Sequence, residues 1–144
     1  MNIKYGFTKT GYHFSKLFKK TAQVKRLERL RARGYQLVFE DNFDSFNAKI
    51  WHKGQVWGAF NPGTLHQYYD SEAVRVKNGI MELWAYHKPK TFQHKDSNIT
   101  IPYGIGLVNT DRSYTSKFGY FEARVKLPIA QAIWPAFWLT GIKS

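Results

Sequence analysis

Carboxylates that lie close together in the sequence are the first candidates for chemistry, because paired acids can serve as general acid and general base. Asp70 and Glu72 are two positions apart, so both would point to the same side of a strand. They have no third acidic partner, and we interpret them as part of a solvated face. Glu40 and Asp41 are adjacent and would point to opposite faces of an extended segment, which argues against a shared role. We therefore predict no catalytic pair among these acids.

The other residue types that carry chemistry also form no catalytic or metal-binding pattern. Cysteine is absent, which excludes disulfides, thiol nucleophiles and thiolate zinc sites. Gly104-Ile105-Gly106 is too short to indicate a phosphate-binding loop. The five histidines have no ligand spacing of the His-Glu-x-x-His kind, and we expect no metal at His13, His52, His66, His87 or His94.

Positive charge is concentrated near the N-terminus. Residues 1–34 contain ten Lys or Arg and a single acid, Glu28, so they contribute +9 of the formal net charge of +12. Gly34 stands where the C-cap of a helix is expected. Four apolar residues fall roughly on one helical face, namely Phe14, Leu17, Val24 and Leu27. We predict a basic amphipathic helical arm over residues 1–34, followed by a second domain over residues 35–144.

Two interpretations of this arm stay open. A basic amphipathic helix can bind nucleic acid, a membrane surface or another anionic surface. It can equally be a solvated helix whose apolar stripe rests on the main domain. We favour the second interpretation, because such a helix alone is a weak signal of binding.

From residue 35 onward, short alternating segments are separated by Gly, Pro, Asn and Asp. Asn78-Gly79 stands between two of them and predicts a tight hairpin. The predicted strands cover residues 36–40, 73–77, 80–86, 105–110, 120–127 and 134–139. Many strands at short spacing with one helix indicate an all-β fold, an antiparallel β-sandwich of the jelly-roll kind.

Two further segments resemble a known family. Gly119-Tyr120-Phe121-Glu122-Ala123-Arg124-Val125-Lys126-Leu127-Pro128, followed by Trp134-Pro135-Ala136-Phe137-Trp138-Leu139, resembles a signature of family 16 glycoside hydrolases, the relatives of laminarinases, lichenases, agarases and carrageenases. Residues 37–44 with Trp51, residues 68–83 and residues 106–110 agree with this family in order and spacing. The resemblance spans about residues 36–142. It implies a concanavalin-like jelly roll whose concave face forms a cleft for a β-linked polysaccharide.

The chain departs from this family in the catalytic motif. Family members carry a Glu-x-Asp-x-x-Glu strand just after the Trp-Pro-Ala-Phe-Trp-Leu segment, and this motif occurs nowhere in the 144 residues. The resemblance therefore implies the N-terminal part of a retaining endo-hydrolase of β-1,3 or β-1,4 linkages, with an incomplete jelly roll that is inactive alone. The alternative is a carbohydrate-binding protein without catalysis.

The resemblance also implies which residues meet the polysaccharide. Glu122 and Arg124 alternate on one predicted strand and would project into the cleft, where they can accept and donate hydrogen bonds to sugar hydroxyls. Aromatic rings in a cleft can stack on pyranose rings. The aromatic candidates are Trp134 and Trp138 on the last predicted strand and Trp57 and Tyr69 in the rim loops, whereas Trp51 is expected in the core.

Three weaker expectations concern cofactors, partners and location. Some family members hold a structural calcium, and Glu40 and Gly79 fall near the matching positions, although we expect no cofactor. An incomplete jelly roll would self-associate or need a C-terminal half. No signal-peptide core is visible, so a cytoplasmic location is expected unless another export route exists.

Overall fold

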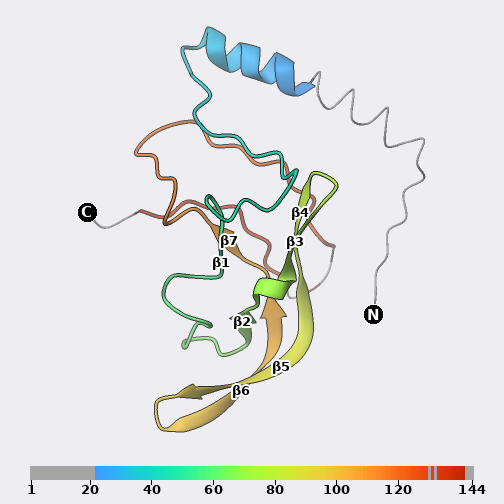
Figure 1. Cartoon of the computed structure of the whole chain (residues 1–144), viewed down its shortest axis with the longest axis vertical. Coiled ribbons are helices and arrows are strands. Elements are labelled where there is room, and N and C mark those ends of the chain that lie inside the picture. The colour runs from blue at the N-terminus through green and yellow to red at the C-terminus, as the bar shows by residue number, and fades with distance from the viewer. Residues whose placement is uncertain (1–21, 130, 132, 142–144) are drawn as a thin grey trace, which may run out of the picture.

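The computed structural model describes residues 22–129, 131 and 133–141. The helix of the predicted arm covers residues 22–32 (Figure 1), whereas Phe14 and Leu17 lie outside the described residues. Gly34 ends the helix with a φ of 85°. The Tyr35 amide bonds to the Leu30 carbonyl at 3.1 Å and the Gly34 amide to the Arg31 carbonyl at 2.9 Å, which is the hydrogen-bond pattern of a Schellman cap. The predicted C-cap is confirmed.

The rest of the described chain is built from short strands and one 3₁₀ turn. They are β1 (His52–Lys53), β2 (Gln67–Tyr69), η1 (Ser71–Ala73), β3 (Val74–Lys77), β4 (Ile80–Leu83), β5 (Ala85–His94), β6 (Ser97–Ile105) and β7 (Val108–Asn109). They form three small sheets, ordered β1-β7, β2-β6-β5 and β3-β4, and none is closed. All pairings are antiparallel except that of β2 with β6, which is parallel. Strands and one helix fit an all-β fold; the jelly roll stays a prediction.

The hairpin predicted at Asn78-Gly79 is confirmed. β3 and β4 pair in register from Val74↔Leu83 to Lys77↔Ile80. Asn78 and Gly79 have φ values of 55° and 69°. Positive φ at both central residues fits the tight turns whose twist matches that of paired strands, and Asn-Gly tolerates this conformation best.

The longest element is the β5–β6 hairpin, which extends to the lower end of the molecule in Figure 1. Its register shifts between His87 and Lys90, around Pro89. Pro89 has no amide hydrogen for the ladder, so an interruption of the pairing at this point is expected. β5 lies at the edge of its sheet because the order is β2-β6-β5.

The buried core of the described residues is small and lies where the three-stranded sheet meets β3. Its members are Tyr68, Ala73, Val74 and Ile101. Gly106 permits the close contact of segments here, since an added Cβ would lie 2.4 Å from the Ala73 carbonyl oxygen. The Trp84 amide donates to that same carbonyl at 2.8 Å, and the Gly106 amide donates to the Trp84 carbonyl at 2.7 Å. Three backbone segments therefore meet at a point with no room for a side chain.

The structure differs from the sequence prediction in three segments. Residues 36–40, 120–127 and 134–139 have no strand ladder. The first two run near each other in Figure 1; Tyr35, just before the first, contacts Tyr120 of the second with ring centroids 6.3 Å apart. Phe39 of the first stacks on Tyr114, which precedes the second, at 4.6 Å. Alternation of apolar residues gives a segment two different faces, but a strand also needs a neighbour for its backbone hydrogen bonds.

Many apolar side chains between residues 118 and 139 are exposed. They are Phe118, Tyr120, Phe121, Val125, Leu127, Ile129, Ile133, Trp134, Phe137, Trp138 and Leu139. In the described part of the chain, no helix has the length and apolar character needed to cross a bilayer.

Candidate functional site

Glu122, the central residue of the predicted cleft, is engaged by two neighbours. Its Oε1 atom forms an ion pair with Arg26 of the helix. Its Oε2 atom accepts a hydrogen bond of 2.9 Å from the Tyr120 hydroxyl. The helix is thereby anchored to the segment that carries the family signature. Each carboxylate oxygen has a second lone pair, so Glu122 can still accept a bond from a hydroxyl.

Arg124 lies two positions further along the same extended segment and is exposed. In the described chain its guanidinium has neither a hydrogen-bond partner nor an ion-pair partner. Its five donors are therefore available to a ligand. The role of Glu122 and Arg124 in binding sugar stays a prediction.

Trp134 and Trp138 present their rings to solvent. Trp134 is 93% exposed and Trp138 is 55% exposed. The segment has no ladder, so the strand geometry that would place both rings on one face is not present. Exposed indole rings of this kind can stack on the apolar face of a sugar. Both residues stay candidates for polysaccharide binding.

Trp57 and Tyr69, predicted in rim loops, are brought together. Tyr69 ends β2, and its amide bonds to the Ala59 carbonyl at 2.7 Å, which ties the Trp57 loop to the sheet. Burial raises the pKa of the Tyr69 hydroxyl, and a hydrogen bond from the Trp57 side chain lowers it in part. The hydroxyl therefore stays protonated at neutral pH. Trp57 itself is 57% exposed, so an aromatic surface borders the sheet at this loop.

The structure also assembles a polar cluster that sequence reasoning missed. Asp70 caps η1 by accepting a 3.0 Å bond from the Glu72 amide. Its Oδ2 atom accepts a 2.7 Å bond from the Tyr86 hydroxyl and a 3.4 Å contact from the Lys88 ammonium. Lys88 also donates to Glu72 at 2.7 Å. The Asp70 side chain is only 11% exposed, so it does not belong to the solvated face that the sequence suggested.

The pKa values in this cluster indicate a structural role. Burial would raise the pKa of Asp70, but hydrogen bonds from Tyr86, the Glu72 backbone and Lys88 outweigh it and hold the pKa below its usual value. Burial and the bond to Asp70 raise the pKa of Tyr86 to about 12. A hydrogen bond to the Glu72 carboxylate, and to a smaller extent one to Asp70, raises the pKa of Lys88. The pKa values of Asp70, Tyr86 and Lys88 are all shifted away from neutral pH, whereas a general acid or base should titrate near it.

A sequence signal for this cluster existed in part. Asp is a preferred N-cap residue, and an acid in the first turn is favourable, so this pair could have placed Asp70 at the start of a turn. Tyr86 and Lys88 come from β5, sixteen and eighteen residues away, and only the pairing of the strands brings them close.

Trp51 lies half-buried in an aromatic cluster. Its ring packs 6.1 Å from Phe39 and 5.7 Å from Phe43, and its indole N–H donates to Asp41 Oδ2 at 2.7 Å. The other oxygen of Asp41 accepts from the Phe43 amide. Glu40 instead accepts from Gln23 of the helix. The two neighbouring acids thus have different partners, as their adjacency in an extended segment predicts.

The calcium hypothesis gains no support from the described residues. Gly79 lies in the hairpin turn, close enough to the Asn42 carbonyl that an added Cβ would be 3.5 Å from its oxygen. Calcium takes six to eight oxygen ligands. Among the described residues, no group of three or more His, Cys, Asp or Glu side chains could hold a metal ion.

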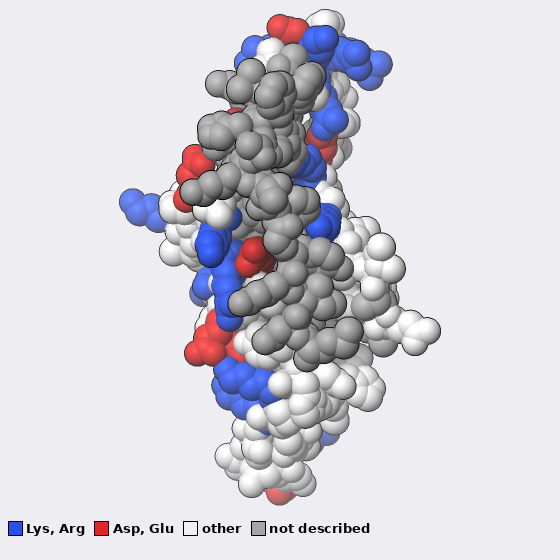
Figure 2. All heavy atoms as spheres, turned by 90° about the vertical axis from the view of Figure 1, so that its right-hand side faces the viewer, with Lys and Arg blue, Asp and Glu red and all other residues white. Residues whose placement is uncertain are grey.

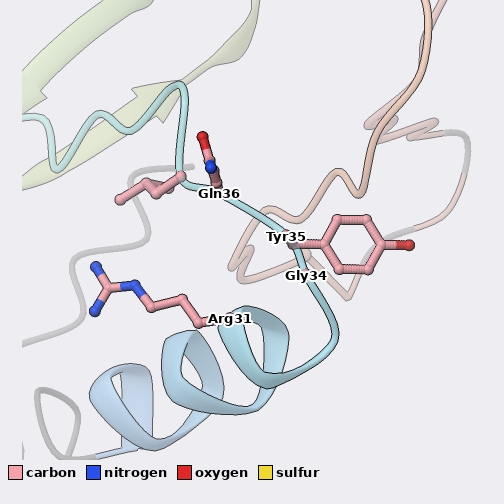
Figure 3. A pocket seen from close by; sticks show the side chains of 5 residues that line it. Arg31, Gly34, Tyr35 and Gln36 are labelled. Atoms are coloured by element: carbon pink, nitrogen blue, oxygen red, sulfur yellow. The ribbon is translucent and has the colours of Figure 1, made fainter.

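A shallow hollow of about 460 Å³ lies where the helix turns into the extended segment (Figure 3). It is lined by Arg31, Gly34, Tyr35, Gln36 and Leu37. Figure 3 shows the Arg31 and Gln36 side chains on one side of the turn and the Tyr35 ring projecting away from them. Polar donors thus line the hollow at the end of the basic helix, and the Tyr35 ring points away from them.

Comparison with known proteins gives three curated relatives. The chain is 26% identical over 117 residues to a glucan endo-1,3-beta-glucosidase A1 of Niallia circulans, covering 74% of this chain and 17% of that protein. It is 26% identical over 103 residues to the endo-1,3-1,4-beta-glycanase ExsH of Rhizobium meliloti, covering 65% and 22% respectively. It is 33% identical over 121 residues to the endo-1,3-1,4-beta-glycanase EglC of the same species, covering 71% and 26%.

These similarities define a class of enzymes to which the chain is related in sequence. All three relatives are named as endo-acting enzymes on β-glucans or β-glycans. The chain spans about a quarter or less of the length of each. No family model matches the chain, and no solved structure matches it.

Proposed function

We propose that the chain is the N-terminal part of a family 16 glycoside hydrolase that cleaves β-1,3 or β-1,4 linkages of a glucan, with retention in the complete protein. The observation that carries this proposal is the similarity to three endo-β-glucanases or glycanases over 65–74% of the chain. The Gly-Tyr-Phe-Glu-Ala-Arg and Trp-Pro-Ala-Phe-Trp-Leu segments support it independently.

In this proposal the chain supplies scaffold and cleft, and the catalytic acids come from elsewhere. Retaining hydrolysis needs two carboxyl groups about 5–5.5 Å apart. The chain has no Glu-x-Asp-x-x-Glu motif. Asp70 and Glu72 are held by Tyr86 and Lys88 instead of facing an open site. The chain alone is therefore inactive, and its exposed apolar residues between 118 and 139 pack against the remainder of the sandwich.

The proposed contacts with glucan combine stacking and hydrogen bonding. Trp134, Trp138 and Trp57 offer exposed indole rings to the faces of pyranose units. Glu122 and Arg124 offer an acceptor and donors to hydroxyl groups. Tyr69 supports the loop that carries Trp57.

Two measurements test this proposal. We expect no reducing sugar to be released from laminarin or lichenan by the full chain, but measurable heat on titration with β-1,3-glucan oligosaccharides. Trp134→Ala should weaken binding by roughly three- to tenfold, the value of one aromatic stacking contact of about 0.5–1.5 kcal/mol. Val38→Ala, which trims another exposed apolar residue, is the matched control. Hydrolysis by the purified chain would refute its inactivity, and absence of heat would refute binding.

A carbohydrate-binding protein without catalysis is the second candidate. The exposed tryptophans, which offer rings for sugar stacking, favour it. The two candidates agree on binding and differ on whether catalytic acids exist in the longer protein. Nucleotides after codon 144 that encode Glu-x-Asp-x-x-Glu in frame would select the hydrolase, and a stop codon there would select the binding protein.

A further inference from the structure

Cations on the helix over residues 22–32 far outnumber acids. Residues 22–34 contain Lys25, Arg26, Arg29, Arg31 and Arg33 against Glu28 alone. At about 100° per residue, Lys25, Arg29, Arg33 and Arg26 occupy one arc of the helix surface, and Leu27 and Leu30 lie beyond it. Figure 2 shows Lys and Arg side chains gathered at the upper end of the molecule, where Figure 1 places the helix.

The helix is oriented by contacts on one side only. Arg26 pairs with Glu122, and Gln23 donates to Glu40. Leu27 and Leu30 are half-buried, whereas Lys25, Arg29, Arg31 and Arg33 are exposed. Within the described part of the chain, these four exposed side chains have no hydrogen-bond or ion-pair partner. Leu27 and Leu30 thus lie on the half-buried side of the helix, whereas Val24 is 46% exposed and the four unpaired cations are exposed to solvent.

This orientation selects among anionic partners. Binding to a lipid surface would require the apolar face of the helix to enter the membrane, but Leu27 and Leu30 on that face are already half-buried. A polymer with anionic groups needs only the outward cations. The Arg26–Glu122 pair and the Tyr35–Tyr120 contact at 6.3 Å place the helix beside the segment that carries the proposed cleft residues.

We propose that the outward cationic face of this helix is a docking surface for an anionic polysaccharide, a β-linked glycan that bears carboxylate or other acidic substituents. This inference rests on the proposed function, because the polymer is held next to the glucan-binding segment. Arg31 and Gln36, which line the hollow at the end of the helix, add donors for an acidic substituent.

The cations also have a structural explanation that the test must separate. Arg29, Arg31 and Arg33 lie in the last turns of the helix, where positive charge offsets the helix dipole. That role would stabilise the helix without any ligand. Loss of helix content and loss of polymer binding are therefore measured on the same variants.

The experiment compares a neutral β-1,3-glucan with the carboxymethylated form of the same glucan by titration calorimetry on the full chain. We expect the carboxymethyl form to bind tighter, with its advantage falling roughly tenfold between about 50 and 200 mM salt, as for a few released counterions. The double variant Lys25→Gln, Arg29→Gln should lose most of this advantage. Lys49→Gln, Lys95→Gln removes the same charge from exposed sites outside the helix and should keep it.

The other possible outcomes distinguish failure of the docking surface from failure of the proposed function. If neutral and carboxymethylated glucan bind equally, or if the helix variant keeps the preference, the docking surface is refuted and the proposed function stands. If neither polymer binds, the proposed function itself fails, and the docking surface with it. Duplex DNA that binds as tightly as carboxymethyl glucan would identify a nucleic-acid surface and overturn the choice of polysaccharide. A variant that loses the preference only together with its helical circular dichroism would show a structural role and refute docking.

Discussion

The region around β2 and β6 and the region from residue 118 to 139 both contain many apolar residues but differ in structure. In the first, paired strands bury Tyr68 and Ile101 almost completely. In the second, Trp134, Phe137 and Leu139 are exposed and no ladder forms. The difference shows that alternation of apolar and polar residues is not sufficient to form a strand. A strand also needs a neighbouring segment that accepts its backbone hydrogen bonds and covers its apolar face.

The largest expected effect comes from trimming the buried region. Ile101 is 0% exposed, so Ile101→Ala should reduce the free energy of unfolding by about 2–5 kcal/mol, through lost burial and a cavity. Leu127, at 57% exposure, is the matched position in the other region, and Leu127→Ala should cost less than about 0.5 kcal/mol. Urea unfolding measures both. Equal losses would mean that residue 127 is packed in solution and would remove the contrast.

The next effect concerns the polar cluster beside the core. Tyr86→Phe removes a hydrogen bond to ionised Asp70 and should cost about 1.5–3 kcal/mol at neutral pH. Asp70 has a lowered pKa, so its stabilising contribution is present above the unfolded pKa of about 4 and is lost as pH falls through the folded value. The cost of Tyr86→Phe should therefore shrink in acid.

Urea unfolding at neutral pH and at about pH 3 checks this prediction. Tyr103→Phe removes an exposed hydroxyl from β6 and serves as the control, with little effect at either pH. A cost of Tyr86→Phe that is independent of pH would show that Asp70 is not its partner.

A smaller effect tests the helix end that joins the two regions. Gly34 has a φ of 85°, which a residue with a Cβ adopts with strain. Gly34→Ala should destabilise the cap by roughly 1 kcal/mol and reduce the helical signal in far-ultraviolet circular dichroism. Gly141, which has no positive φ, provides the control Gly141→Ala. An unchanged spectrum in Gly34→Ala would contradict the Schellman cap.

The smallest effect is expected from the helix anchor. Arg26 and Glu122 form a partly exposed ion pair, so Arg26→Gln should change stability by only about 0–1 kcal/mol. Amide hydrogen exchange in residues 22–32 should nevertheless become faster, because the helix loses a tether. Arg29→Gln, which removes an unpaired cation of the same helix, should leave exchange unchanged. Equal acceleration in both variants would show that Glu122 does not hold the helix.

Local signals in the sequence predicted the features that depend on few residues. Gly34 and Asn78-Gly79 require positive φ, and both were found where their residue types placed them. The β5–β6 hairpin was missed because residues 85–105 show no clean alternation and Pro89 argues against a strand. Residues 36–40, 120–127 and 134–139 were predicted as strands from their alternation alone, and the sequence does not show whether a neighbouring strand is available for pairing.

In the candidate site, too, local sequence signals indicated single residues but not the contacts between distant segments. The family resemblance proposed Glu122, Arg124 and the tryptophans as sugar-binding residues, which stays a prediction, but it did not indicate that Arg26 from the helix would meet Glu122. Asp70 was read as solvated because Tyr86 and Lys88, its partners, are far away in sequence. Contacts between distant segments set the state of a carboxylate, and no local pattern records them.

The interruption at Pro89 has a consequence for the solubility of the chain. A ten-residue strand with a free edge is a template on which another chain can add a strand. Here Pro89 and the register shift divide that edge, and Lys88 and Lys90 place positive charges on either side of the break. An incoming strand would meet an irregular edge with two lysines beside the break. The longest free edge of the described structure is thus protected against fibrous growth.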